Sequence, residues 1–124
     1  MVILYTYGTQ TLVFIAGESS GTYSITSTSQ PGSTLIPTGM TRPSYAASGV
    51  TIVTAVWGSA QIASQDVWNN IYSSQASGTA IPFGNSFFGG DNWYGTVKTG
   101  TIWYYKNGAL TSIGARENTN KVMP

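Results

Sequence analysis

A glycine-rich loop holds the residues best suited to chemistry in this chain. Residues 83–95 read FGNSFFGGDNWYG, in which a carboxylate, an amide and two aromatic rings follow one another at Asp91, Asn92, Trp93 and Tyr94. An aromatic ring packs against the C–H face of a sugar, while carboxylate and amide groups exchange directional hydrogen bonds with its hydroxyls. Glycines let the backbone approach such a ligand closely. These four residues therefore form the candidate ligand-binding site, and a glycan is the ligand that they suit.

The same residues also have a structural interpretation. Asp side chains often stabilise turns by accepting hydrogen bonds from nearby backbone N–H groups. Asp91 could also pair with Lys98, although an exposed ion pair contributes only about 0–1 kcal/mol. Tryptophan is usually mostly buried, so Trp93 could pack into the core instead of binding a ligand. Trp57 and Trp103 lie within expected strands, and we expect both to belong to the core.

Several catalytic chemistries are excluded by the residues that the chain lacks. It contains no His and no Cys, which removes thiolate and imidazole metal sites, Cys nucleophiles and the Ser-His-Asp relay. A glycosidase with a carboxylate pair such as Asp66 and Asp91 remains a formal option. We expect a protein that is not an enzyme, with no catalytic residue, no metal site and no cofactor.

Charge is scarce along the whole sequence. The 124 residues include five basic and four acidic side chains, so 7% are charged and the net charge is +1, against about 25% charged residues in typical domains. This composition lacks the basic patch that nucleic acids or acidic membranes require. We expect membrane contact only through surface glycans. Because few Lys or Glu residues protect strand edges, a homo-oligomer, either a dimer or a tetramer, is also expected.

The sequence pattern predicts an all-β fold. β-Branched residues, which favour strands, are abundant, and 15 Gly and 5 Pro punctuate them. The Asn107-Gly108 pair predicts a tight hairpin, because both residues tolerate the positive φ that its turn requires. We expect one antiparallel β-sandwich domain of about seven to nine short strands over residues 1–124, with residues 1–46 as its N-terminal strands. The expected strands are 2–7, 11–16, 22–28, 49–57, 79–83, 96–105 and 109–117.

One short helix is expected near residues 64–74. Ser64 is a suitable N-cap, and Asp66 falls in the first turn, where a carboxylate suits the helix dipole. Apolar side chains at i, i+4 spacing give this helix one packing side: Val67, Trp68, Ile71 and Tyr72.

The N-terminal residues do not resemble a targeting segment. The sequence MVILYTYGTQ has no basic stretch, and its apolar run is interrupted at Thr6 and Gly8. This pattern predicts neither a signal peptide nor a transmembrane segment. We expect a cytoplasmic protein or one secreted without a leader, and the absence of Cys excludes disulfides.

The second part of the chain, residues 48–124, resembles a known family. An ordered series of features carries the resemblance: Ala55-Val56-Trp57-Gly58, Asp66-Val67, Ile81-Pro82, Phe88-Gly89-Gly90-Asp91, Gly95, Lys98, Tyr104-Tyr105, Arg116-Glu117 and Val122-Met123-Pro124. It looks like the C-terminal β domain that accompanies certain DnaJ-like proteins and also occurs alone in fungal proteins. The resemblance implies a β-sandwich used for interaction, without established catalytic residues. It also implies that Asp91, Gly95 and Lys98 belong to a shared structural pattern.

Three functions are compatible with these observations. The first is a small lectin that binds glycans without a metal, and the second is a protein-interaction or assembly module that forms a homo-oligomer, as the resemblance implies. The third is a membrane-damaging β protein, because the Ser- and Thr-rich strands expected at 11–16 and 22–28 alternate polar and apolar residues as pore-lining strands do. Glycan binding through the 91–94 segment is the leading hypothesis.

Overall fold

The structure, a computed structural model, describes residues 1–16, 22, 33–35, 37 and 39–124. It divides into two compact units, Met1–Ile36 and Pro37–Pro124, and each is described by itself. The described residues form nine strands in antiparallel sheets and one helix, which confirms the all-β prediction with a single short helix. The prediction of one domain stays a prediction, and the strand expected at 22–28 lies almost wholly outside the described residues.

The described residues of the first unit form an antiparallel sheet with the strand order β1-β2-β3. Its strands are β1 (Val2–Tyr7), β2 (Gln10–Ile15) and β3 (Ser33–Leu35). The hairpin between β1 and β2 has a two-residue connection in which Gly8 adopts a φ of +60°. Glycine is the residue that reaches this conformation without steric cost, so the predicted strands 2–7 and 11–16 pair as neighbours.

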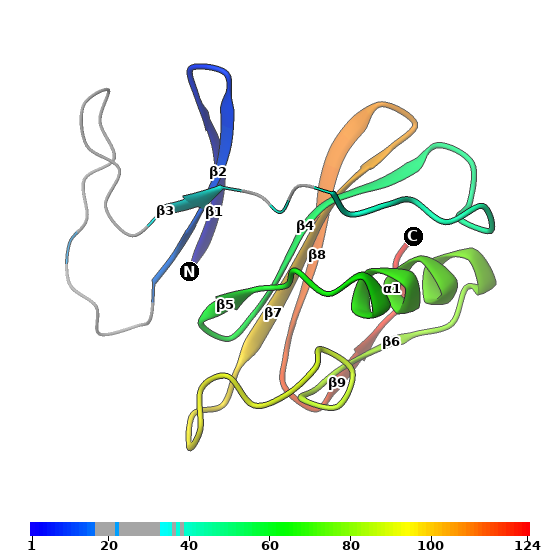
Figure 1. The fold of residues 1–124 in the computed structure, drawn as a ribbon. Helices are drawn as coiled ribbons and strands as arrows, with labels where there is room; N and C mark the ends of the chain where they lie inside the picture. Colours follow the sequence, from blue (N-terminus) through cyan, green and yellow to red (C-terminus); the bar gives the residue numbers. More distant parts are fainter. Residues whose placement is uncertain (17–21, 23–32, 36, 38) are drawn as a thin grey trace. The chain divides into compact units, whose positions relative to one another are not determined.

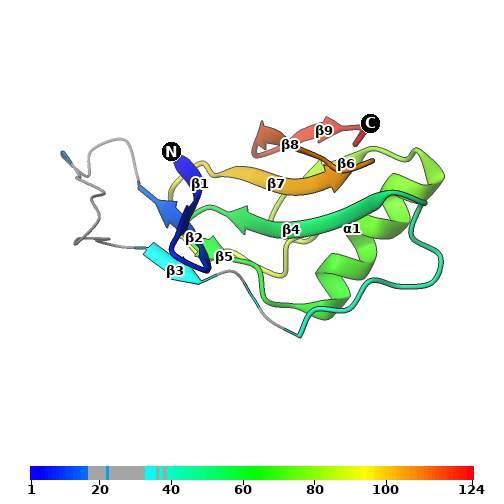
Figure 2. The same ribbon diagram turned by 90° about the horizontal axis from the view of Figure 1, so that it is seen from above.

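The second unit is built on a four-stranded antiparallel sheet with the order β5-β4-β7-β8. These strands are β4 (Val50–Trp57), β5 (Ala60–Gln61), β7 (Thr99–Lys106) and β8 (Ala109–Arg116). The helix α1 (Gln65–Ser77) lies along one face of this sheet (Figures 1 and 2), and β6 (Ile81–Phe83) pairs with β9 (Thr119–Lys121) as a small separate sheet. The core lies between the large sheet, α1 and the β6–β9 pair.

The β7–β8 hairpin forms as predicted around the Asn-Gly pair. Asn107 and Gly108 have φ values of +51° and +82°, and Lys106 lies directly opposite Ala109. Positive φ at both central positions is the signature of a type I′ turn, whose twist matches that of the flanking strands. From this turn the pairing runs without a bulge to Thr99 opposite Arg116.

The predicted helix is present with the predicted cap. The Ser64 hydroxyl accepts a hydrogen bond from the Val67 N–H at 3.4 Å, and Asp66 lies in the first turn. The helix extends to Ser77, three residues beyond the expected end, because Gly78 is the residue that adopts the left-handed conformation of a C-cap, with φ +69°. In the described part of the chain, no helix has the length and apolar character needed to cross a membrane.

The packing side of α1 consists of the expected residues, and two of them also make polar contacts. Val67, Trp68, Ile71 and Tyr72 are all buried. The Tyr72 hydroxyl accepts a hydrogen bond from the Ile52 N–H at 2.8 Å, next to the bulge in β4, and the Trp68 indole donates to the Ile62 carbonyl at 3.0 Å. Burial raises the pKa of Tyr72, so its hydroxyl remains neutral. Each of these aromatic side chains therefore has its polar atom satisfied inside the core.

The two strand tryptophans have different environments. Trp57 is fully buried in the core, as expected. Trp103 is only partly buried. Because successive side chains of a strand point to opposite faces, the core residues Ile102 and Tyr104 place Trp103 on the other face of β7. The expectation that Trp103 belongs to this core was therefore wrong.

We predict that Gly100→Ala destabilises the protein. Gly100 lies opposite Trp57, and a Cβ atom there would come within 2.8–3.0 Å of the Phe83 and Trp57 rings. Neither buried ring can move freely, so overpacking should lower the free energy of unfolding by about 1–3 kcal/mol, measured by urea denaturation. Gly84→Ala is the control, because a Cβ there meets nothing within 4 Å. Equal unfolding midpoints for the two variants would contradict this packing argument.

Candidate ligand-binding loop

The predicted site lies in the loop of residues 84–98, which joins β6 to β7 and is called the 84–98 loop below. Its first half is fixed to the core by aromatic packing. Phe88 is buried and stacks on the Trp57 ring, with a centroid separation of 5.0 Å and an interplanar angle of 11°. The Trp57 indole also donates a hydrogen bond to the Asn85 side chain at 3.0 Å. One side chain at the end of β4 therefore holds two positions of the loop.

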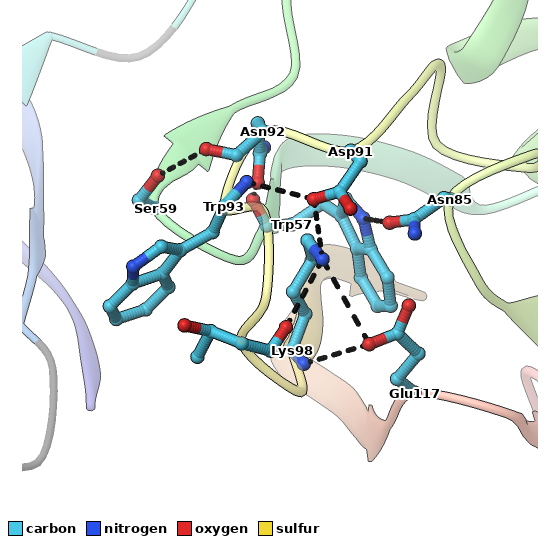
Figure 3. A network of polar contacts seen from close by, with 9 residues as sticks. Trp57, Ser59, Asn85, Asp91, Asn92, Trp93, Lys98 and Glu117 are labelled. Carbon is cyan, nitrogen blue, oxygen red and sulfur yellow. Dashed lines mark hydrogen bonds and ion pairs between the residues drawn. The ribbon is translucent and has the colours of Figure 1, made fainter.

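Asn92 belongs to the support of the loop. Its side-chain amide donates to the Trp57 carbonyl at 2.6 Å, and its own carbonyl accepts from the Ser59 hydroxyl at 3.1 Å (Figure 3). A Cβ atom at Gly58 would lie 2.5 Å from the Asn92 amide oxygen, so this side chain rests against the β4–β5 turn. The amide predicted to bind a ligand is therefore bonded to the scaffold.

Asp91 makes two contacts through one carboxylate oxygen. Its Oδ1 atom accepts from the Lys98 ammonium at 2.7 Å and from the Trp93 N–H at 3.1 Å (Figure 3). The second contact is the turn-stabilising bond that the structural interpretation anticipated. The ion pair is present as well, but it is not an exposed pair: the Asp91 side chain is 33% exposed, whereas that of Lys98 is 2% exposed.

The Lys98 ammonium lies among three groups with acceptor oxygens. Besides Asp91, it donates to the Thr96 carbonyl at 3.2 Å and lies 3.9 Å from the Glu117 carboxylate. The Lys98 backbone N–H donates to that same carboxylate at 3.1 Å, and the Glu117 N–H donates to the Lys98 carbonyl at 2.8 Å. A buried charge is tolerated when it is paired and hydrogen-bonded. Lys98 thus links the loop to the β7–β8 hairpin.

The β7–β8 register explains why Lys98 meets Glu117. The two residues are equally distant from the Asn107-Gly108 turn, one just before β7 and the other just after β8. Glu117 is not among the predicted site residues, although counting outward from the predicted turn identifies it as the partner of Lys98. Ser59 was also missed, and no spacing in the sequence indicates that it meets the loop.

The environment of Asp91 keeps its carboxylate ionised. The hydrogen bond from the Lys98 ammonium lowers the pKa of Asp91 below its ordinary value of 3.8, and the bond from the Trp93 N–H acts in the same direction. Partial desolvation opposes these effects and is outweighed. Asp91 therefore meets Lys98 as a carboxylate at neutral pH.

Beyond Asn92 the chain turns outward and exposes apolar side chains. The Thr96 N–H donates to the Trp93 carbonyl at 3.2 Å, and Gly95 at the third position of this turn has a φ of +75°. Trp93 is 38% exposed, Tyr94 92% and Val97 56%. Residues 93–97 are called the loop tip below. Figure 3 shows the Trp93 ring pointing away from the contact between Asp91 and Lys98.

The four predicted site residues therefore divide into two pairs. Asp91 and Asn92 make the inward contacts that hold the base of the loop, and Trp93 and Tyr94 lie at the exposed tip. The arrangement presents two aromatic faces on a supported turn, which suits binding by stacking.

Comparisons with protein-family models, with curated proteins and with solved structures found no match to this chain. The resemblance of residues 48–124 to the DnaJ-associated β domain stays a prediction.

We predict an acid-dependent loss of stability that depends on Asp91. Because the pKa of Asp91 is lowered in the folded state, its charge stabilises the fold above its ordinary pKa of 3.8, and this contribution is lost as the pH falls through the lowered value. Asp91→Asn should lower the urea midpoint at neutral pH, and the difference from the unsubstituted protein should shrink below pH 3.8.

Repeating the urea measurement in a protein that lacks Lys98 tests whether the effect depends on the ion pair. In a Lys98→Met protein, adding Asp91→Asn should have a smaller pH-dependent effect, because the cation is already absent. The urea midpoints of the Asp91→Asn and unsubstituted proteins could instead differ by the same amount at every pH. That result would show that the Asp91 charge does not stabilise the fold.

Proposed function

We propose that this protein is a non-catalytic, metal-independent carbohydrate-binding protein whose ligand lies on Trp93 and Tyr94. The observation that carries the proposal is the exposure of two neighbouring aromatic side chains, 38% and 92%, at the tip of a loop with a tethered base. The C–H face of a sugar ring can stack on either aromatic face. Asp91 and Asn92 then act as supporting residues, in contrast to the sequence-based hypothesis that both contact the ligand.

The tethered base matters for affinity. Binding costs free energy whenever a loop must become ordered, and a loop already held in its binding conformation avoids part of that cost. Stacking of Phe88 on Trp57, the Asn92 amide bond and the Asp91–Lys98 pair all involve side chains outside the tip, and the ion pair joins its two ends. They leave the tip itself free to contact a partner.

Polar groups near the tip can supply the directional part of recognition. The Thr96 and Tyr94 hydroxyls lie on exposed residues of the tip. These oxygens are suited to the hydroxyl rim of a sugar.

A protein-interaction module is the second candidate function. Its specific support is Val97, which is 56% exposed beside the two aromatic residues and makes the tip more apolar than sugar stacking requires. Exposed Tyr and Trp side chains with an aliphatic neighbour are typical of the centres of protein interfaces.

The glycan proposal predicts a binding loss confined to tip variants. The full-length protein should bind a subset of a glycan array, and Trp93→Ala should weaken the affinity for the best glycan at least about tenfold, or about 1.4 kcal/mol, by calorimetry. Tyr94→Ala should also weaken it, because its exposed ring forms the second face. Tyr105→Ala is the matched control, since Tyr105 is a 43% exposed tyrosine outside the loop.

Two results would count against this function in different ways. An array without any bound glycan would remove carbohydrate binding and leave the protein-interaction candidate. Glycan binding that is unchanged in folded Trp93→Ala and Tyr94→Ala proteins would move the site away from the tip.

A further inference from the structure

The strand β8 forms an unusually open edge of the four-stranded sheet. It lies at the end of the order β5-β4-β7-β8, and among the described residues it pairs with β7 alone. It is eight residues long, its pairing has no bulge, and Arg116 at its end is its single charged residue. Natural proteins usually block such edges with charges, prolines, bulges or short strands. By contrast, β5 has two residues and β6 contains Pro82.

The pairing of β8 with β7 shows which backbone N–H and C=O groups of β8 face the open edge. The Glu117 N–H donates to the Lys98 carbonyl, so the backbone of residue 117 faces the β7 side. Because residues of an antiparallel strand alternate between bonding one neighbour and the other, every second residue before it also faces β7. The backbone N–H and C=O groups of Leu110, Ser112, Gly114 and the terminal Arg116 therefore point away from β7, toward the open edge.

We propose that two copies of this chain associate through antiparallel pairing of their β8 strands about a two-fold axis at Ser112. In this register Ser112 lies opposite the partner's Ser112, and Leu110 lies opposite the partner's Gly114. A two-fold interface must be self-complementary, and an antiparallel pair of identical strands meets that requirement. The register centred at Ser112 also gives Leu110, Ser112 and Gly114 each a backbone partner in the other copy.

The side chains on the same face fit this register. Leu110 is 47% exposed and lies opposite Tyr105 of β7, which is 43% exposed. Across the proposed interface Leu110 meets a glycine, whose missing side chain leaves room for the leucine over the joined sheet. The pairing covers exposed apolar surface in both copies, and no like charges meet at the axis. It also places the two loop tips at opposite ends of one continuous sheet, an arrangement suited to a divalent binder.

Sedimentation equilibrium of the full-length protein tests the pairing. We expect the apparent mass to rise with concentration from 13.1 kDa toward twice that value. Ser112→Pro removes an outward N–H without removing a β7–β8 hydrogen bond, so the fold should persist, as checked by circular dichroism, while association weakens at least about tenfold. Ser112→Lys provides a second route, because it places two ammonium groups side by side at the axis.

The controls separate this edge from other causes of association. Ser73→Lys adds the same charge at an exposed position of α1 and should leave the dimer intact. Leu4→Lys perturbs β1, which is also an edge strand, and should likewise leave it intact. A monomeric unsubstituted protein, dimers that persist in both folded Ser112 variants, or a dimer lost only in Leu4→Lys would overturn the proposal. A monomer that still binds glycans would leave the proposed function standing.

Discussion

The Asn107-Gly108 turn fixes the register of β7 against β8, and most of the organisation of residues 37–124 depends on that register. A two-residue turn allows one alignment of its strands, and a slip by a single residue would exchange the two faces of each strand. The alignment keeps Ile102 and Tyr104 in the core. It also brings Lys98 opposite Glu117 at the far end of the hairpin. The positive φ required at Asn107 and Gly108 thus determines which face of β7 enters the core. It also determines the contact between Lys98 and Glu117, about nine residues from the turn along each strand, or about 30 Å at the usual rise per residue.

The buried Lys98 ammonium connects this hairpin to the loop above it. An isolated charge would be costly at 2% exposure. Asp91, Glu117 and the Thr96 carbonyl offset that cost by surrounding the ammonium with oxygens. The loop base cannot leave without uncovering the charge, so the ion pair holds the base more firmly than two exposed side chains would. The tip takes part in this network through the Trp93 N–H and the Thr96 carbonyl. The aromatic side chains of Trp93 and Tyr94 are not among these contacts, so their exposure is compatible with it.

Several of the few charged side chains of this chain make contacts within the protein. Two of the four acidic residues of the chain, Asp91 and Glu117, lie around one lysine. The arginine Arg42 is likewise committed to backbone carbonyls, including that of Val50 at 2.8 Å. With charges used internally, the strand edges have few left to protect them. This composition agrees with the association that we propose at β8.

The sequence by itself determined the features that depend on near neighbours. Positive φ at Asn107 and Gly108, the Ser64 cap and the spacing from Val67 to Tyr72 are local requirements, and the structure contains all of them. Tertiary structure decided which side chains face inward. The sequence placed Asp91, Asn92, Trp93 and Tyr94 together in one site, but Trp57 and Lys98 bind the first two, leaving the aromatic pair exposed. Residues that are distant along the chain, such as Trp57 and Lys98, bond the same polar atoms that a ligand would bond. The order of residues within the loop does not indicate these distant partners.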